Sequence, residues 1–334
     1  IMLGVGFYSR RHATNVNDFV LGGRGVGPWL TAFAYGTSYF SAVVFIGYAG
    51  QFGWKYGLAS TWIGYSLLFW FYPLAWLVVL SVTRWQFIGV PQFTGLQNII
   101  GVLHDALFWT SMWNICRFLM WYVPIVFITA LLFAAGLRRI NYGRGFIALS
   151  FLLANISSGV AYSIVFSRLF NEYGPVNRLL SAWFGISVPW FTNPDCAMLS
   201  IALIVTWKFV GYYGLILYSG MQAIPSDIYS AAILDKTGRF QKGWAITLPM
   251  MNPQIVMVMV LAITVAFSIF TEPYLITGGG PLNSTTSPMV VMYEAAFQNM
   301  KPTWAAAMSI IVAACSFLMI WLFRRLFEKH IEIV

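Results

Sequence analysis

The sequence predicts an all-α fold, a polytopic bundle of membrane-spanning helices, and three observations predict it. Hydrophobic residues make up 59% of the 334 residues. Charged residues make up only 9%, against roughly a quarter in an ordinary soluble domain. The apolar residues are also gathered in long runs, several of them near the ~20 residues that a helix needs to cross a bilayer. So few charges cannot cover a water-facing surface of this size, which excludes a soluble fold.

The composition excludes two further classes of protein. Cys116, Cys196 and Cys315 are few, odd in number and mostly set in apolar runs, which argues against a secreted disulfide scaffold. The net charge of +9 could indicate nucleic-acid binding, but the basic residues lie between apolar runs rather than along one stripe. That distribution is typical of membrane topology.

Seven apolar runs qualify as spanning helices. They lie at about 30–52, 61–83, 113–136, 146–167, 198–221, 253–275 and 304–323. Residues 1–7 are too short to span and look like the tail of another helix rather than a signal peptide.

The orientation of the spans is predicted by the basic residues that flank them. If 61–83 runs outward and the later spans alternate, the inner segments carry nine Lys and Arg residues and the outer segments four. Cytoplasmic loops carry the excess of positive charge in membrane proteins. The count therefore favours six helices from residue 61 onward, with both ends of this unit in the cytoplasm.

The N-terminal part conflicts with this topology. Arg10, Arg11 and Arg24 precede span 30–52 and would hold its start inside, so that span should also run outward. Two consecutive outward spans cannot be joined by the short link 53–60. Span 30–52 is therefore inverted or re-entrant, or residues 1–58 are foreign to the rest of the chain.

Residues 222–250, between two spans, have the pattern of an amphipathic cytoplasmic helix and its adjoining turns. Pro225 and Ser226 can start a helix, and Asp227 suits the positive end of its dipole. Ile228, Ala231, Ala232 and Asp235 then recur at helical spacing. One interpretation is an interfacial helix that lies on the membrane.

The same segment resembles the EAA loop of ABC importer permeases, E-A-A-x3-G-x9-I-x-L-P. Ala231, Ala232, Ile246, Leu248 and Pro249 match this motif, while Ser230 replaces its Glu and Lys236 its Gly. The resemblance implies a coupling helix that docks on a separate ATP-binding subunit. The residues that it implies in this contact are Asp227, Tyr229, Ser230, Ala231, Ala232, Asp235, Lys236, Leu248 and Pro249. A subunit with weakened coupling is an alternative, because Ser230 removes a charged contact.

The resemblance extends over about residues 61–334 and is closest to sugar permeases of the maltose and glycerol-3-phosphate group. It rests on the segments 71–73, 81–85, 207–212 and 270–285, with the sequences FYP, SVTRW, WKFVGY and FTEPYLITGGGPLNST. It implies that residues 59–334 form a six-helix type I permease core in the bacterial cytoplasmic membrane. Such a subunit forms half of the pathway for a sugar or sugar-like solute in binding-protein-dependent transport.

The resemblance also implies partners. These are a second, similar permease, two ATP-binding subunits that hold ATP and Mg²⁺, and an extracytoplasmic solute-binding protein. No cofactor is expected on this chain itself.

Residues 4–60 resemble instead the start of a sodium/solute symporter. The resemblance rests on the segments 6–11 and 18–32, with the sequences GFYSRR and DFVLGGRGVGPWLTA. The later helices that a sodium site needs are absent from the sequence, so we expect residues 1–58 not to transport by themselves. A sodium-coupled symporter fragment, or a fusion of the two kinds of protein, is the alternative function.

Polar and aromatic residues inside the spans are the candidates for the substrate pathway. Lys208 lies about ten residues into span 198–221, and Glu272 lies near the outer end of span 253–275. Polar groups at such depth are costly and therefore mark functional sites. Sugars bind aromatic faces and hydroxyl groups, which Trp207, Gly211, Tyr212, Tyr213, Phe267 and Ser268 could provide. The alternative is that these residues only pack the helices together.

No pattern for catalysis is present in the sequence. The phosphate-binding loop G-x-x-x-x-G-K-[ST] is missing, so this chain is not expected to hydrolyse ATP by that route. His12, His104 and His330 are scattered, and no Cys or carboxylate falls at metal-ligand spacing. We therefore predict a transport subunit, not an enzyme.

Overall fold

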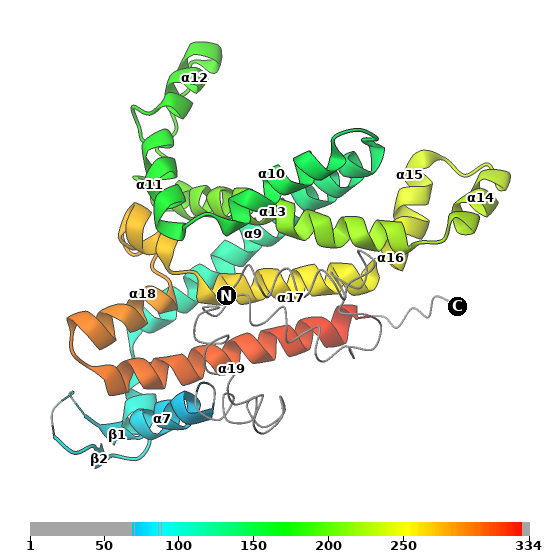
Figure 1. Ribbon diagram of the computed structural model, residues 1–334. Coiled ribbons are helices and arrows are strands. Elements are labelled where there is room, and N and C mark those ends of the chain that lie inside the picture. The colour runs from blue at the N-terminus through cyan, green and yellow to red at the C-terminus, as the bar shows by residue number, and fades with distance from the viewer. Residues whose placement is uncertain (1–68, 70, 86, 88, 329–334) are drawn as a thin grey trace, which may run out of the picture. The chain divides into compact units, whose positions relative to one another are not determined.

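A computed structural model describes residues 69, 71–85, 87 and 89–328 (Figure 1). The chain divides into two units, Ile1–Trp76 and Leu77–Val334, and the helix packing is that of the second unit. The symporter-like segment 1–58, span 30–52 and residues 61–68 of the next expected span lie outside the described residues.

Four segments in the described part of the chain are long and apolar enough to cross a membrane. They are α9 (Ala106–Arg139), α13 (Pro194–Ala223), Asn252–Thr277 and α19 (Pro302–Phe327). The third of these contains α17 (Asn252–Ser268) and a π-helical turn, η4 (Pro273–Thr277). The expected spans 113–136, 198–221, 253–275 and 304–323 are thereby confirmed as apolar segments, although the third is interrupted.

The expected span 146–167 is not one straight helix. It forms α10 (Arg144–Ile156) and α11 (Gly159–Leu169), which are bent by 97° relative to each other. Ser157 and Ser158 lie at the bend with extended backbone, and the Ser157 hydroxyl donates to the Ala154 carbonyl at 2.6 Å. Short hydroxyl side chains compete in this way with the backbone ladder of a helix. The expected span 146–167 is therefore confirmed as an apolar segment, but it is a bent pair of helices rather than one straight helix.

The remaining elements are short. The described chain begins with α7 (Tyr72–Ser81), the antiparallel pair β1 (Thr83–Arg84) and β2 (Gln92–Phe93), and α8 (Gln97–Leu103). Between the longer helices lie α12 (Pro175–Phe184), α14 (Ser226–Leu234), α15 (Arg239–Lys242), η3 (Gly243–Thr247), α16 (Leu248–Met250), α18 (Pro288–Tyr293) and η5 (Glu294–Gln298).

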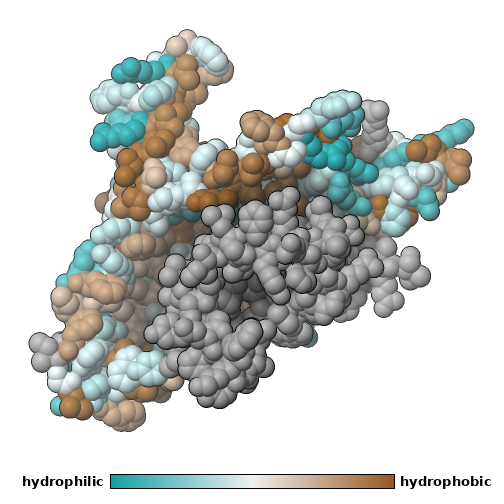
Figure 2. Space-filling model, in the orientation of Figure 1, coloured by the Kyte–Doolittle hydropathy of each residue, from teal (hydrophilic) through white to brown (hydrophobic). Residues whose placement is uncertain are grey.

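The core is built on one stripe of α9. Phe108, Ile115, Phe118, Tyr122 and Val126 recur every three to seven residues and are all buried. Along α9 runs α13, while α17 packs on α9, α13 and α19, so that α13, α17 and α19 lie side by side (Figure 1). Large apolar side chains remain exposed on α10 and α11, where Figure 2 shows brown surface. A lipid-facing or subunit-facing surface is expected to look this way.

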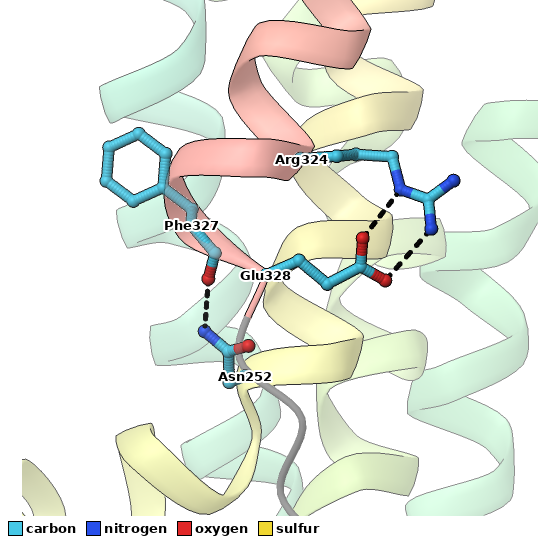
Figure 3. A network of polar contacts seen from close by, with 4 residues as sticks. All are labelled: Asn252, Arg324, Phe327 and Glu328. Atoms are coloured by element: carbon cyan, nitrogen blue, oxygen red, sulfur yellow. Dashed lines mark hydrogen bonds and ion pairs between the residues drawn. The ribbon is translucent and has the colours of Figure 1, made fainter.

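Two polar contacts lie at the end of this bundle where α17 begins and α19 ends (Figure 3). The Asn252 amide donates to the Phe327 carbonyl at 3.0 Å. Arg324 forms a bidentate ion pair with Glu328, at 2.8 and 2.9 Å. The first contact links the two helices, and the second fixes the last turn of α19.

Candidate functional site

The first candidate site is the coupling segment, which we define as residues 222–250. Its principal helix, α14, leaves the end of α13 after Pro225 and carries Asp227 in its first turn. This confirms the helix that the sequence predicts there. A carboxylate at this position is stabilised by the partial positive charge of the helix N-terminus.

The end of α14 explains why the motif has a glycine at position 236. The Lys236 amide donates to the Ile233 carbonyl, and the Thr237 amide donates to the Ala232 carbonyl, which together form a Schellman motif. That motif requires a left-handed residue, and Lys236 adopts a φ of 55°. Lys236 therefore occupies a conformation that glycine adopts at lower cost.

Tyr229 attaches α14 to the membrane helices. Its hydroxyl lies 2.9 Å from the Thr247 hydroxyl, and the Arg138 guanidinium lies 4.9 Å from the centre of its ring. Of the motif residues, Ala232 is buried, whereas Ser230, Ala231, Asp235 and Pro249 are exposed and Leu248 is half-buried. The outward surface of the segment also carries Ile233, Leu234, Phe240 and Trp244 as exposed apolar side chains. Such a patch is typical of a docking surface.

The second candidate site is the place where the two interrupted spans meet. The chain breaks between α10 and α11 at residues 157–158, and again after α17, where Ile269 is extended. A Cβ on Gly159 would lie 3.2 Å from the methyl group of Thr271, so the two breaks are in direct contact. Interrupted helices that meet inside a membrane are where transporters form solute sites.

Lys208 lies close to this region with its charge set among aromatic rings. Its ammonium is 4.7 Å from the ring centre of Tyr162 on α11 and 5.5 Å from that of Phe209. Trp207 is 44% exposed, and its ring lies 5.0 Å from that of Phe166. Within residues 89–328 no ion pair involves Lys208 or Glu272.

The other expected pathway residues take different positions. Tyr213 and Phe267 are buried in the core, and the Tyr213 hydroxyl lies 3.4 Å from that of Tyr122. Glu272 is also buried, at 6% exposure. The Ser268 side chain is exposed but bonds its own helix, at the Thr264 carbonyl.

Gly211 and Tyr212 are the last two of the expected pathway residues. A Cβ on Gly211 would lie 2.6 Å from the backbone carbonyl of Phe151, so this glycine allows α13 to approach α10 closely. Tyr212 is half-buried, with its ring 5.7 Å from that of Tyr213. The structure thus brings Trp207 and Lys208 to an accessible aromatic surface, and places Gly211, Tyr213 and Phe267 in helix packing.

Three aromatic residues on α11 and at its C-terminal cap also belong to this surface and were not predicted from the sequence. Tyr162, Phe166 and Phe170 succeed one another at intervals of four, and their rings contact in sequence at 6.5 and 5.8 Å. Residues four apart lie on one face of a helix, so this spacing was a signal for an aromatic surface. The row continues to Trp190, whose ring lies 5.0 Å from that of Phe170.

These features define a multi-pass membrane protein with the fold of an importer permease. Residues 98–331 match the family model of the binding-protein-dependent transport system inner membrane component. That match covers more than half of the chain and includes the coupling segment and both breaks. The chain belongs to this family.

Individual proteins agree with the assignment. The chain is 30% identical over 253 residues to the probable ABC transporter permease protein YurN of Bacillus subtilis (strain 168), covering 74% of this chain and 86% of that protein. It is 32% identical over 262 residues to the lactose transport system permease protein LacF of Rhizobium radiobacter, covering 75% and 87%.

A solved structure shares the fold. It is the crystal structure of a bacterial ABC transporter involved in the import of the acidic polysaccharide alginate, with a TM-score of 0.71, 18% identity and coverage of 85% of this chain and 98% of that one. The permease fold is therefore shown. The comparisons give the symporter alternative no support.

Proposed function

We propose that this chain is one of two permease subunits of an ABC importer and forms half of the pathway for a sugar or sugar-like solute. The observation that carries the proposal is the family match over residues 98–331, which runs through the coupling segment and both interrupted spans. Relatives whose names refer to lactose transport and alginate import support a carbohydrate as the solute.

The proposed partners are a second permease, two ATP-binding subunits and an extracytoplasmic binding protein, in a bacterial cytoplasmic membrane. ATP and Mg²⁺ would be held by the ATP-binding subunits, and this chain would bind no cofactor. The exposed residues Ile233 and Leu234 at the end of α14 provide an apolar surface for the ATP-binding subunit. Movement of that subunit would then be passed through Tyr229 to the end of α9.

The proposed solute site is the aromatic surface formed by Trp207 and Phe166 over the buried ring of Tyr162, with Lys208 as its polar group. An aromatic ring binds the C–H face of a sugar, while an ammonium group binds its hydroxyl or acidic oxygens. Glu272 and Ser268 lie on the neighbouring segment and are the next candidates. Gly211, Tyr212, Tyr213 and Phe267 would act by positioning this surface.

The test is to co-express the full chain with its candidate partner permease, ATPase and binding protein, and to purify them through a tag on this chain. Recovery of the ATPase, and its stimulation by sugar-loaded binding protein, is expected. The failure of this chain to recover any ATPase would contradict the proposal.

One variant makes this test specific. Leu234 is 83% exposed at the end of α14, so Leu234→Asp should release the ATPase subunit, because a charge in an apolar contact is poorly solvated. Tyr142 is 94% exposed in the link between α9 and α10, outside the coupling segment. Tyr142→Asp is the matched control and should leave the recovered amount of ATPase unchanged.

A further inference from the structure

A cavity of about 600 Å³ lies between the membrane helices and the coupling segment. It is an open hollow, bounded by the end of α9, the start of α10, the end of α13 and α14. The polar side chains that line it are Arg138, Arg144, Tyr218, Gln222, Ser226, Tyr229 and Ser230. This volume falls in the range of small-ligand sites.

Two guanidinium groups face this cavity, and no carboxylate is among the residues that line it. Arg138 stacks on Tyr229 and donates to its hydroxyl at 3.4 Å. Arg144 donates to the Ile140 carbonyl at 3.0 Å and lies 5.7 Å from the centre of the Tyr218 ring. Neither arginine is in either of the ion pairs found in the part of the chain that the structure describes. The lining therefore carries two positive charges without an anion of its own.

The position of Ser230 accounts for this imbalance. Ser230 lines the cavity at the place where the related loop motif has glutamate. Its hydroxyl donates to the Ser226 carbonyl of its own helix at 3.1 Å. A hydroxyl group does not neutralise a guanidinium, and Arg138 is exposed while Arg144 is half-buried, so both charges are open to an anion from another molecule.

The position of the cavity at the ends of the membrane helices indicates which molecule supplies the anion. Arg138 lies in the last turn of spanning helix α9, Arg144 lies in the first turn of α10, and Tyr218 lies within two turns of the end of α13. Two residues after Arg144, Phe146 is 76% exposed and suits the acyl-chain region. Basic pockets between helices on the cytoplasmic side bind lipid headgroups. This position, near the ends of apolar helices and beside an exposed Phe146, favours a lipid phosphate over an acidic side chain of a partner subunit.

We propose that the cavity binds the phosphate of an anionic phospholipid, with Arg138 and Arg144 as its charged ligands. Tyr218, Gln222 and Ser230 provide hydrogen-bonding groups at its wall. Because Arg138 also contacts Tyr229, a bound phosphate would fix the end of α9 against α14. The charge of the membrane would then set the position of the coupling segment. This inference does not depend on which solute is transported.

The experiment measures lipid binding by the purified, delipidated complex of the full chain and its partner subunits. The probes are phosphatidylglycerol, phosphatidylcholine and inorganic phosphate, each titrated while the melting temperature is recorded. Phosphatidylglycerol should raise the melting temperature more than phosphatidylcholine. In the double variant Arg138→Gln/Arg144→Gln, the phosphatidylglycerol concentration that gives half of the shift should rise about tenfold. The reason is that charge-assisted hydrogen bonds to the phosphate are lost.

Two further variants keep the test decisive. Arg139→Gln removes the same charge from an exposed neighbour that does not line the cavity, and should bind phosphatidylglycerol as the wild type does. Ser230→Glu keeps both arginines and provides an internal carboxylate, so it should also weaken binding. If the double substitution prevents assembly, Ser230→Glu alone gives the answer.

Each outcome has a defined meaning. A shift produced by inorganic phosphate that needs Arg138 and Arg144 supports the same chemistry with a soluble source. Equal phosphatidylglycerol binding by the wild type and the double variant overturns the proposal. If the double variant loses the ATPase subunit while its lipid binding is unchanged, the proposal is also overturned, because the cavity would then receive a partner's side chain. The readout needs no transport, so this result is separable from a failure of the importer proposal.

Discussion

Polar side chains inside the spans differ in how fully their hydrogen-bonding capacity is used. Asn114 on α9 is 2% exposed and donates to the carbonyls of Asn283 at 2.7 Å and Thr286 at 3.0 Å, so it fixes the loop before α18. The buried hydroxyl of Tyr162 has no hydrogen-bond partner among the described residues, and Lys208 faces the ring of that residue. Buried polar groups are normally paired. The unused capacity at Tyr162 and Lys208 is the reason why we propose the solute site there.

Removal of the Lys208 charge tests this interpretation. Lys208→Met keeps a stem of similar length but deletes the ammonium, so the importer should assemble normally. The concentration of sugar-loaded binding protein that half-stimulates ATP hydrolysis should rise about tenfold, the typical cost of one charged hydrogen bond. The matched control is Lys301→Met, which removes the same charge at an exposed position just before α19. Unchanged stimulation in Lys208→Met would place the solute elsewhere.

The left-handed conformation of Lys236 leads to a prediction on stability. Lys236→Gly should stabilise the end of α14 by about 1 kcal/mol, because glycine adopts positive φ without steric cost. Asp235 is the preceding residue and has an ordinary φ of −75°. Asp235→Gly should therefore destabilise the same turn. Hydrogen exchange of residues 226–238 in the assembled complex measures both changes, and slower exchange in Asp235→Gly than in Lys236→Gly would refute the assignment.

At the scale of elements, the approach of α13 to α10 depends on Gly211. Gly211→Ala should lower the stability of the complex by about 1–3 kcal/mol, because the added Cβ would meet the Phe151 backbone at 2.6 Å. The matched control is Gly136 on α9, where an added Cβ would meet no described atom within 4 Å. Gly136→Ala should be neutral or stabilising by up to about 1 kcal/mol, since alanine favours helix. Thermal melting compares the two, and equal effects would exclude a close helix contact.

The sequence could predict which elements exist better than it could predict their direction. Spans are predicted from apolar composition, which is why α9, α13 and α19 were found, each slightly longer than expected. Hydropathy does not report where a helix changes direction, so the 97° bend after Ile156 was not predicted. Ser157 and Ser158 do not by themselves indicate a break, because hydroxyl residues also occur within spanning helices. The coupling helix was predicted because its capping residues are local.

Within the candidate site, sequence reasoning located individual residues but not their neighbours. Lys208 stands out in the sequence because a charge in an apolar run is conspicuous. Its contact with Tyr162 joins different helices, and no spacing along the chain encodes such a pairing. Tyr213 and Phe267 could not be separated from Trp207 by residue type, because burial decides their positions.

At the scale of the whole molecule, side-chain contacts link different elements at the two ends of the helices in the unit Leu77–Val334. At the end where α17 begins and α19 ends, Asn252 links α17 to α19 and Arg138 links α9 to α14. At the other end, Asn114 fixes the loop before α18. Each link joins elements that are distant in the sequence. Movement of α14 would therefore reach α9 through the contact between Tyr229 and Arg138.

The orientation of this unit is the last prediction, and it can be tested by labelling from one side of the membrane. The excess of basic residues near α9–α10, α14 and the end of α19 places these regions in the cytoplasm. Single cysteines would replace Tyr142 and Leu234 on that side, and Tyr173 and Met300 on the other, all of which are exposed. The background would carry serine at Cys116, Cys196 and Cys315. An impermeant maleimide added to intact cells should label positions 173 and 300, and should reach 142 and 234 only after the membrane is opened. Labelling of 142 and 173 from the same side would overturn the topology. It would also remove the cytoplasmic assignment on which the coupling segment and the phosphate cavity depend.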